Sequence, residues 1–189
     1  MEKVTIVMPV FNEAVIIQNT LSTIKDNPDL EIIVVDGGST DNTVKLVLEM
    51  GVNVVKSPNP GRANQMNFGA QFATGNILLF LHADTKLPKN YTTLIQETLL
   101  DSETIAGAFQ LAIDSDKQEL RLIENLVNWR SHFFSLPYGD QGIFLKASVF
   151  QEIGGFPNLP IMEDFEFIRQ RKKHGKITIV SAKVITSAR

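Results

Sequence analysis

Short runs of β-branched and apolar residues alternate with helix-like segments from the start of this chain, and this alternation constrains the fold most. Residues 4–10 and 31–35 are predicted strands, and residues 13–26 between them place Ile17, Leu21 and Ile24 on one helical face, with Asn12 as the expected N-cap. Ile32–Val35 has no polar residue, which is typical of a strand buried on both faces of a parallel sheet. The pattern predicts a three-layer α/β/α domain with a mostly parallel central sheet.

The same alternation continues to the end of the chain. Further strands are expected over residues 52–55, 76–81, 104–113, 142–145 and 176–180, and further helices over residues 39–50, 62–74, 88–99, 117–134, 148–153 and 163–174. We find no repeat, low-complexity segment or linker. A chain of 189 residues is therefore expected to form a single domain, 1–189.

Composition excludes several classes of protein. The formal net charge of -3 argues against a nonspecific nucleic-acid binder, and the absence of cysteine excludes disulfide scaffolds and thiolate chemistry. The N-terminal apolar run becomes polar at Asn12 and Glu13, too early for a signal peptide, and the longest clean apolar run, residues 77–81, is too short for a membrane span. We expect a cytoplasmic protein that at most contacts the inner face of a membrane.

Acidic residues follow three of the predicted strands. Glu13 follows the first strand, Asp36 ends the second, and Asp84 follows the fourth. Ligands of open α/β sheets bind outside the carboxyl ends of the strands, so these three carboxylates would line one crevice if the first and fourth strands are neighbours. Each also has a structural explanation: an Asx turn for Asp36, a first-turn helix charge for Glu13, and the start of a loop for Asp84. Carboxylates do not hold bare phosphates, so a divalent cation or ribose hydroxyls would mediate.

Common catalytic motifs are missing from the sequence. It has no phosphate-binding P-loop, no G-x-G-x-x-G dinucleotide motif and no G-x-S-x-G nucleophile elbow. Its three histidines, His82, His132 and His174, are too scattered to form a zinc pair. Kinases, dinucleotide-dependent dehydrogenases and zinc hydrolases are therefore disfavoured.

An aspartate interrupts the apolar stripe of the last predicted helix. Ile161, Asp164, Phe165 and Ile168 share one helical face, whereas Glu163 points about 100° away. An aspartate in such a stripe is costly to bury unless it is paired or functional, so Asp164 is the better candidate for chemistry. The alternative is an aspartate that only favours the helix N-terminus.

Two further groups of residues have both structural and functional explanations. The basic run at the end of the last helix, formed by Arg169, Arg171, Lys172, Lys173 and Lys176, fits dipole complementation and solvation, with contact to a diphosphate or an anionic membrane as alternatives. Trp129, His132 and Phe133, on the predicted helix 117–134, are expected to pack in the core, with an acceptor pocket as the alternative. The same helix also carries the apolar residues Leu120, Ile123, Leu126, Val127 and Phe134.

Five segments in order give the chain its resemblance to a known family. They are residues 7–13 (VMPVFNE), 33–41 (IVVDGGSTD), 61–67 (GRANQMN), 81–84 (LHAD) and 163–164 (ED). Over nearly its whole length the chain resembles family 2 nucleotide-sugar glycosyltransferases of the GT-A fold. The forms of residues 81–85 and 138–142 look most like a bacterial branch described as radical-SAM/selenodomain-associated transferases.

The resemblance implies inverting transfer of a sugar from a nucleoside diphosphate donor, of UDP or GDP type, to an unknown acceptor hydroxyl. Residues 1–100 would then form the nucleotide-binding half and residues 101–189 the acceptor-side half. The donor-binding positions of the family correspond to Pro9, Phe11, Glu13, Asp36, Arg62, Gln65, His82 and Asp84 in this sequence. Asp84 would hold Mg²⁺ or Mn²⁺ on the diphosphate, and Asp164 would be the general base.

One position departs from the family pattern. His82 replaces the first aspartate of the Asp-x-Asp motif, which puts the ribose contact, or a second metal contact, in doubt. A non-catalytic nucleotide-sugar binding module is therefore an alternative function. A sugar-nucleotide nucleotidylyltransferase is another, although the first strand lacks the glycine-rich loop that such an enzyme needs after it.

Overall fold

A single mixed β-sheet forms the centre of the protein. The computed structural model describes residues 2–25, 27, 29–159, 161–171 and 175–188. The strands in this part of the chain are β1 (Val4–Val10), β2 (Leu30–Asp36), β3 (Asn53–Lys56), β4 (Ile77–Phe80), β5 (Thr85–Lys86), β6 (Thr104–Asp114), β7 (Ile143–Lys146) and β8 (Lys176–Ser187). Their order across the sheet is β3-β2-β1-β4-β7-β6-β8-β5.

The first half of the chain forms the parallel part of the sheet. β1 pairs in parallel with β2 on one side and with β4 on the other, and β2 pairs in parallel with β3. β7 then inserts antiparallel to both β4 and β6, whereas β6 and β8 are parallel to each other. The predicted α/β fold is confirmed, and strands β1 to β4 of the first half of the chain are all parallel to one another.

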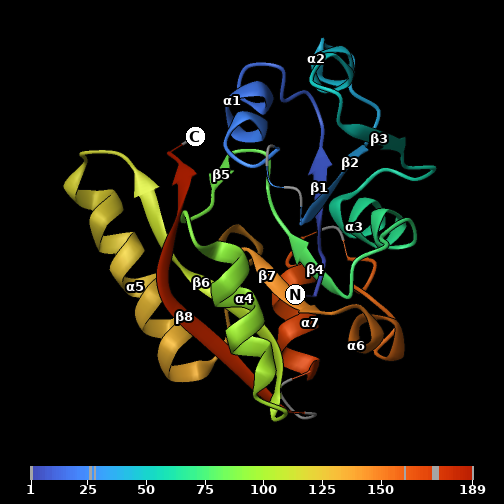
Figure 1. Ribbon diagram of the computed structural model, residues 1–189. Coiled ribbons are helices and arrows are strands. Elements are labelled where there is room, and N and C mark those ends of the chain that lie inside the picture. The colour runs from blue at the N-terminus through green and yellow to red at the C-terminus, as the bar shows by residue number, and fades with distance from the viewer. Residues whose placement is uncertain (1, 26, 28, 160, 172–174, 189) are drawn as a thin grey trace.

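Helices cover both faces of the sheet (Figure 1). Within the described residues they are α1 (Ile17–Ser22), α2 (Thr43–Glu49), α3 (Arg62–Ala70), α4 (Tyr91–Leu100), α5 (Gln118–Phe134), α6 (Ala147–Glu152) and α7 (Glu163–Arg171), with a short 3₁₀ turn, η1 (Gly139–Gln141). Helices α1, α2 and α4 contribute to the core on one face, and α3, α6 and α7 to the core on the other. The expected three layers are therefore present.

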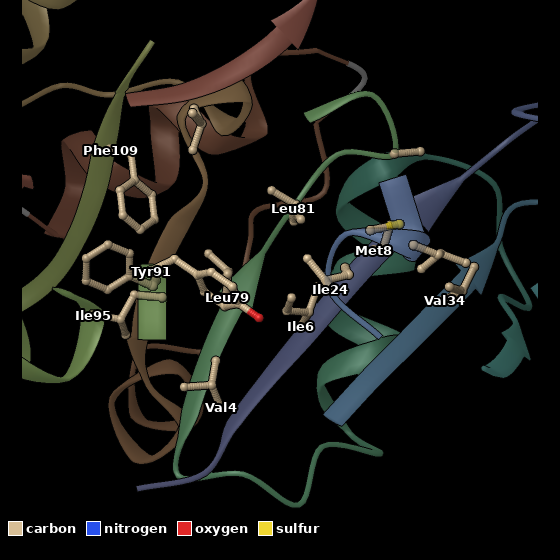
Figure 2. Packing of buried hydrophobic residues seen from close by; sticks show 14 of the residues in the cluster. Val4, Ile6, Met8, Ile24, Val34, Leu79, Leu81, Tyr91, Ile95 and Phe109 are labelled. Atoms are coloured by element: carbon tan, nitrogen blue, oxygen red, sulfur yellow. The ribbon is translucent and has the colours of Figure 1, made fainter. Parts of the chain in front are cut away.

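Successive side chains of β1 point to opposite faces of the sheet and contribute to the hydrophobic core on each face. Val4, Ile6 and Met8 are fully buried on the face shown in Figure 2, whereas Val7 packs on the opposite face. Successive strand residues point to opposite faces, so a strand that is covered on both sides must be apolar at nearly every position. Each of these side chains contributes about 1.5–3 kcal/mol through burial.

The first helix is shorter than its apolar spacing predicted, and Asn12 is not its N-cap. Helix α1 covers only Ile17–Ser22, and the predicted end at Asp26 lies outside the described residues. Asn12 instead has a positive φ of 55°, and its side-chain Oδ1 accepts a hydrogen bond from the Thr40 N–H at 2.8 Å. Asparagine tolerates this left-handed conformation better than most residues, and its side chain ties the β1–α1 loop to the β2–α2 loop.

The orientation of α5 contradicts the sequence prediction. Ile123, Leu126 and Phe134 are exposed, and the expected core packing of Trp129 and Phe133 is wrong, because both are more than half exposed. The buried residues of this helix are Glu124 and Ser131.

The reason for this orientation lies in β6. Strand β6 pairs with β7 only at Ala106 and Gly107, so the backbone farther along the same edge needs other partners. The side chain of Asn128 bonds both the N–H and the C=O of Leu111, at 2.7 and 2.8 Å, and Glu124 accepts from the N–H of Ile113 at 3.2 Å. Helix α5 therefore turns its polar face toward the sheet.

We predict that Gly69→Ala destabilises the protein by about 1–3 kcal/mol, because overpacking strains a dense core. A Cβ on Gly69 of α3 would lie 2.5 Å from Val35 Cγ2 and 2.6 Å from Val7 Cγ1, side chains that the sheet holds in place. Chemical denaturation measures the change. Gln71→Ala, an exposed position just after the same helix, should change the free energy of unfolding by less than about 0.5 kcal/mol. Equal stabilities of the two variants would contradict the close approach of α3 to the sheet.

Candidate active site

A polar cavity of about 260 Å³ opens at the carboxyl ends of β1 and β4. Its lining includes seven of the predicted donor-binding residues: Pro9, Phe11, Glu13, Arg62, Gln65, His82 and Asp84. The parallel pairing of β1 with β4, in the register Val7↔Phe80, brings the segments after these two strands together. The condition on which the predicted crevice depended, that the first and fourth strands are neighbours, is therefore met.

A second cavity of about 420 Å³ shares three of these residues, Phe11, Arg62 and Gln65. The rest of its lining is Gly37, Pro60, Gly61, Ile161, Met162 and Glu163. Because residues of α3 and the β1–α1 loop belong to both cavities, the two form adjacent parts of one recess. We call them the inner cavity, which contains Asp84, and the outer cavity, which contains Gly37.

Asp36 does not line either cavity. It is buried, and its two carboxylate oxygens accept hydrogen bonds from the backbone N–H groups of Gly38, at 3.1 Å, and Ser39, at 2.9 Å. These bonds fix the turn after β2. The Asx-turn explanation therefore describes what Asp36 does in the structure, while the next residue, Gly37, lines the outer cavity.

Gln65 clamps the ends of two strands. Its Nε2 donates to the C=O of Val10, at 2.9 Å, and to the C=O of Val35, at 2.8 Å. A Cβ on Gly37 would lie only 2.9 Å from the Gln65 carboxamide, so glycine is required for this close approach. Gln65 thereby sets the spacing of the β1 and β2 ends that border the recess.

Arg62 pairs with Glu163. As the first residue of α3, Arg62 places a cation at a helix N-terminus, where it is unfavourable. The Glu163 carboxylate, at the start of α7, lies 3.5 Å from Arg62 Nε and is buried, whereas the Arg62 side chain is about half exposed. This pair links α3 to α7 across the recess and keeps the guanidinium at the boundary between the inner and outer cavities.

His82, which replaces the first motif aspartate, is neutral at physiological pH. Part of its ring is accessible from the inner cavity, but protein atoms surround most of it, and this burial lowers its pKa to about 4. Arg62 lowers the pKa further, whereas the negative charges of Asp84 and Asp164 act in the opposite direction. A neutral imidazole can donate or accept a hydrogen bond, but it does not add negative charge to the site.

Asp164 lies beside His82 and the η1 turn. Its Oδ2 accepts a hydrogen bond from the Gly139 N–H, and its Oδ1 accepts from the Phe165 N–H at 2.7 Å. A Cβ on Gly139 would lie 2.8 Å from Asp164 Oδ2 and 3.2 Å from His82 Nε2, so only glycine fits between them. The second half of the chain therefore brings one carboxylate next to His82, which lines the inner cavity.

Helix α7 begins later than the predicted stripe. It starts at Glu163, and Ile161 lies before it, 74% exposed, whereas Ile168 is fully buried. Asp164 and Glu163 are both buried in the first turn, so the stripe does not separate these two carboxylates.

Two described residues of the basic run pair with carboxylates of this chain. Lys176 Nζ lies 3.2 Å from Asp101 Oδ2. Arg169 forms two hydrogen bonds to Glu166, at 2.8 and 2.9 Å, on the exposed side of the helix. Lys172 and Lys173 lie outside the described residues. The solvation explanation for this run fits the described part, and diphosphate contact from Arg169 finds no support in its position.

Asp140 is a site residue that the sequence reasoning did not assign. It lies on η1, next to Gly139, and its Oδ1 is buried without a hydrogen-bond partner. Burial raises the pKa of Asp140 to about 6, and the negative charge of Asp164 adds to the effect, while Arg130 opposes it. The available signal was the segment Tyr138–Gly142, which contributed to the family resemblance.

The inner cavity fits a divalent cation that is shared with a phosphorylated ligand. Oxygen ligands suit Mg²⁺ and Mn²⁺, and Asp84 supplies a carboxylate at the cavity wall. Among the described side chains, no three or more Asp, Glu or His residues gather closely enough to hold an ion by themselves. Mg²⁺ is commonly bound by one or two carboxylates together with substrate phosphates, and that arrangement is the one these residues allow.

Comparison with known proteins identifies the family. The chain matches Glycosyl transferase family 2 over residues 5–156 and therefore belongs to this family. An uncharacterized glycosyltransferase of Rickettsia felis is 34% identical over 89 residues, which cover 47% of this chain and 31% of the relative. Poly-beta-1,6-N-acetyl-D-glucosamine synthase of Staphylococcus epidermidis is 33% identical over 91 residues, covering 44% of this chain but 22% of the synthase. The matched part is thus less than a third of each of these relatives.

Solved structures share the fold at low sequence identity. The mannosyltransferase PcManGT from Pyrobaculum calidifontis, in complex with GDP-Man and Mn²⁺, superposes with a TM-score of 0.79 at 23% identity, covering 98% of this chain and 56% of that protein. Glucosyl-3-phosphoglycerate synthase from Mycobacterium tuberculosis, in complex with Mn²⁺, UDP and glucosyl-3-phosphoglycerate, superposes with a TM-score of 0.77 at 17% identity. The match covers 100% of this chain and 73% of the synthase. The expected GT-A fold is confirmed. Within the described ranges, no helix is long and apolar enough to cross a membrane.

We predict that Asp140→Asn stabilises the protein increasingly as pH rises from 4.5 to 7.5. The folded pKa of about 6 exceeds the ordinary value of 3.8, so between these values only the unfolded carboxyl ionises and stability falls as pH increases. The asparagine removes this penalty, which is at most about 3 kcal/mol above pH 6.

Thermal melts of both proteins across this pH range test the prediction. Asp116→Asn, at an exposed position, should show no such trend. A difference between Asp140→Asn and the original protein that stays constant with pH would show that Asp140 ionises normally in the folded state.

Proposed function

We propose that this protein is an inverting glycosyltransferase that uses a nucleoside-diphosphate-sugar donor of UDP or GDP type. The observation that carries the proposal is the convergence of the donor-binding residues on one recess, with the Asp164 carboxylate beside His82 at its edge. The solved relatives in complex with GDP-Man, UDP and Mn²⁺ support a donor of this class.

In this proposal the donor occupies both parts of the recess. The nucleoside lies in the outer cavity, where Phe11 is 58% exposed and offers an aromatic surface beside the Gly37 backbone. The diphosphate lies in the inner cavity, toward Asp84 and within reach of Arg62, whose guanidinium suits phosphate oxygens. Asp36 acts indirectly, because its carboxylate holds the turn that presents Gly37.

Asp84 would hold Mg²⁺ or Mn²⁺ together with the diphosphate oxygens. A divalent ion there supplies neutralisation of the negative charge that develops on the leaving diphosphate. Arg62, which also lines the inner cavity, adds positive charge. His82, being neutral, leaves Asp84 as the motif's single carboxylate and is suited to hydrogen bonding with a ribose hydroxyl.

Asp164 is the proposed general base. The acceptor hydroxyl gives its proton to the Asp164 carboxylate as its oxygen forms the new bond to the anomeric carbon, and the bond from that carbon to the diphosphate breaks with its electron pair going to the diphosphate. Gly139 and Phe165 donate to the Asp164 oxygens and hold the carboxylate in one orientation. A single base on the face opposite the leaving group is sufficient for inversion.

The two other carboxylates nearby fit the base role less well. Glu163 is directed to Arg62, with its Oε1 atom 3.5 Å from Arg62 Nε. Asp140 holds its proton up to about pH 6, and its unpartnered Oδ1 is buried. The resemblance to the radical-SAM/selenodomain-associated branch, which rests on residues 81–85 and 138–142, remains part of this proposal, as do the two functional halves, 1–100 and 101–189.

We predict that UDP or GDP with MnCl₂ raises the melting temperature by several degrees, since a ligand at 100 times its Kd stabilises by about 2.7 kcal/mol. Asp84→Ala should lose the metal-dependent part of the shift, and Asp29→Ala, an exposed control, should keep it. The measurement is differential scanning fluorimetry with and without EDTA. A nucleotide shift that EDTA and Asp84→Ala both leave unchanged would remove Asp84 as the metal ligand.

We predict that Asp164→Asn lowers the rate of nucleoside diphosphate release by at least about 100-fold, because asparagine cannot accept the acceptor's proton. The variant should fold and bind UDP or GDP nearly as well as the original protein. The assay follows diphosphate release from a panel of UDP- and GDP-sugars, with sugar acceptors or water. Glu163→Gln should cost much less in rate.

Three outcomes would change this assignment. Near-normal turnover by Asp164→Asn, with Glu163→Gln or Asp140→Asn inactive, would move the base to another carboxylate. Loss of folding in Asp164→Asn would indicate a structural role for Asp164. Donor binding without turnover by the original protein, for every donor and acceptor tried, would favour a nucleotide-sugar binding module.

A further inference from the structure

Helix α5 carries a continuous apolar stripe on its outward face. Leu122, Leu126, Trp129 and Phe133 are 63%, 57%, 54% and 66% exposed, and their i, i+4, i+7, i+11 spacing places them in one row along the helix. Ile123 and Phe134 flank the row and are 47% and 49% exposed. We call these six residues the α5 stripe. Figure 1 shows α5 at the edge of the molecule, beside β6.

The stripe cannot turn inward, because the opposite face of α5 is committed to the sheet. The backbone edge of β6 is bonded by Asn128 at Leu111 and by Glu124 at Ile113. Ser131, fully buried on the same face, donates to Gln141 Oε1 at 2.8 Å. Rotating the helix would leave these part-buried backbone groups without their hydrogen-bond partners, which is unfavourable away from water. The apolar row is therefore held at the surface by the fold.

We propose that the α5 stripe is the interface of a homodimer, in which α5 of one copy packs antiparallel against α5 of a second copy. A large aromatic side chain has a surface of about 150–250 Å², and about half of the surface of each stripe residue is exposed. The six residues together therefore expose roughly 500 Å² of apolar area. A standard interface buries about 800 Å² per partner, and in homodimers about 65% of that area is apolar. The apolar area that each partner contributes is therefore also about 500 Å². The stripe thus has the apolar area that one half of a stable dimer interface needs.

The stripe is also suited to pairing with itself. Twofold symmetry requires a surface that is complementary to its own copy, and a straight row of Leu and aromatic side chains along a 17-residue helix satisfies this when the helices run antiparallel. Asn125, which is exposed, borders the row within one residue of the helix midpoint. The Asn125 amides of the two copies would meet near the twofold axis, where each can donate to and accept from the other.

Charge favours a second copy over a lipid surface. An aromatic and aliphatic helix face would also suit a bilayer interface, but such helices bind membranes with the help of Lys and Arg beside the apolar face. The formal net charge of this chain is -3, and Arg121, next to the stripe, forms an ion pair with Glu124 at 2.7 Å. An anionic bilayer therefore gains little from this surface.

Sedimentation equilibrium over 1–100 µM protein tests the proposal. We expect a dimer, and we expect Leu126→Glu to raise its dissociation constant at least about 100-fold, because it places a charge in the centre of the apolar contact. The matched control is Leu100→Glu, an 81% exposed leucine at the end of α4, which should leave the dissociation constant unchanged. Circular dichroism confirms that both variants fold, and folding is expected because both positions are exposed.

Cross-linking tests the antiparallel geometry. The chain has no cysteine, so Asn125→Cys introduces a single thiol near the proposed axis, and a bismaleimide reaching about 10 Å, the distance between packed helix axes, should join two copies. The control variant Leu100→Cys should not be joined.

Several outcomes would overturn the proposal: a monomer at 100 µM, a dimer that Leu126→Glu leaves intact, or cross-linking of Leu100→Cys but not of Asn125→Cys. Cosedimentation of a monomer with phosphatidylcholine–phosphatidylglycerol vesicles would assign the stripe to a membrane surface instead. These tests do not depend on glycosyl transfer, so they succeed or fail separately from the proposed function.

Discussion

The position of β1 between β2 and β4 is the constraint on which the recess depends. Parallel pairing on both sides brings the carboxyl ends of these strands to one edge of the sheet, and the following loops therefore contribute Phe11, Gly37 and Asp84 to adjacent cavities. Burial on both faces stabilises this arrangement, and the Gln65 carboxamide fixes the spacing of the strand ends. A recess at this edge follows from the strand order, before any catalytic residue is considered.

Residues from the second half of the chain influence the protonation of the groups beside Asp84. β7 runs antiparallel to β4, so the η1 turn that precedes it lies at the same edge of the sheet as the motif after β4, and Gly139 can touch both Asp164 and His82. Burial at this junction acts in opposite directions on two ionisable groups. It keeps the His82 imidazole neutral and raises the pKa of Asp140, since in both cases the charged form is disfavoured. Below about pH 6, this junction therefore carries less negative charge than its carboxylates would have in water.

Helix α5 shows how one unpaired strand edge determines a distant surface. Because β7 is short, the outer edge of β6 would present buried backbone groups without partners, and Gln141, Asn128 and Glu124 bond to Phe109, Leu111 and Ile113 in turn. The polar face of α5 is used for this purpose, and the apolar face is left outward. The same Gln141 holds η1, which carries Gly139, so the surface of α5 and the position of Asp164 share one hydrogen-bonded network.

The sequence by itself determined the strands of the parallel half and the helix that starts at Arg62, and it placed Glu13 and Asp84 directly after two of those strands, because apolar runs and the residues that follow them are local features. The clustering of Glu13 and Asp84 depends on the parallel pairing of β1 with β4, which the tertiary structure decided. The tertiary structure alone decided that Asp36 builds a turn, that Arg62 pairs with Glu163, and that α5 faces outward with its apolar side. Each of these depends on which distant segment comes to lie alongside, and hydrophobic periodicity shows that a helix has an apolar face but not which face the sheet requires.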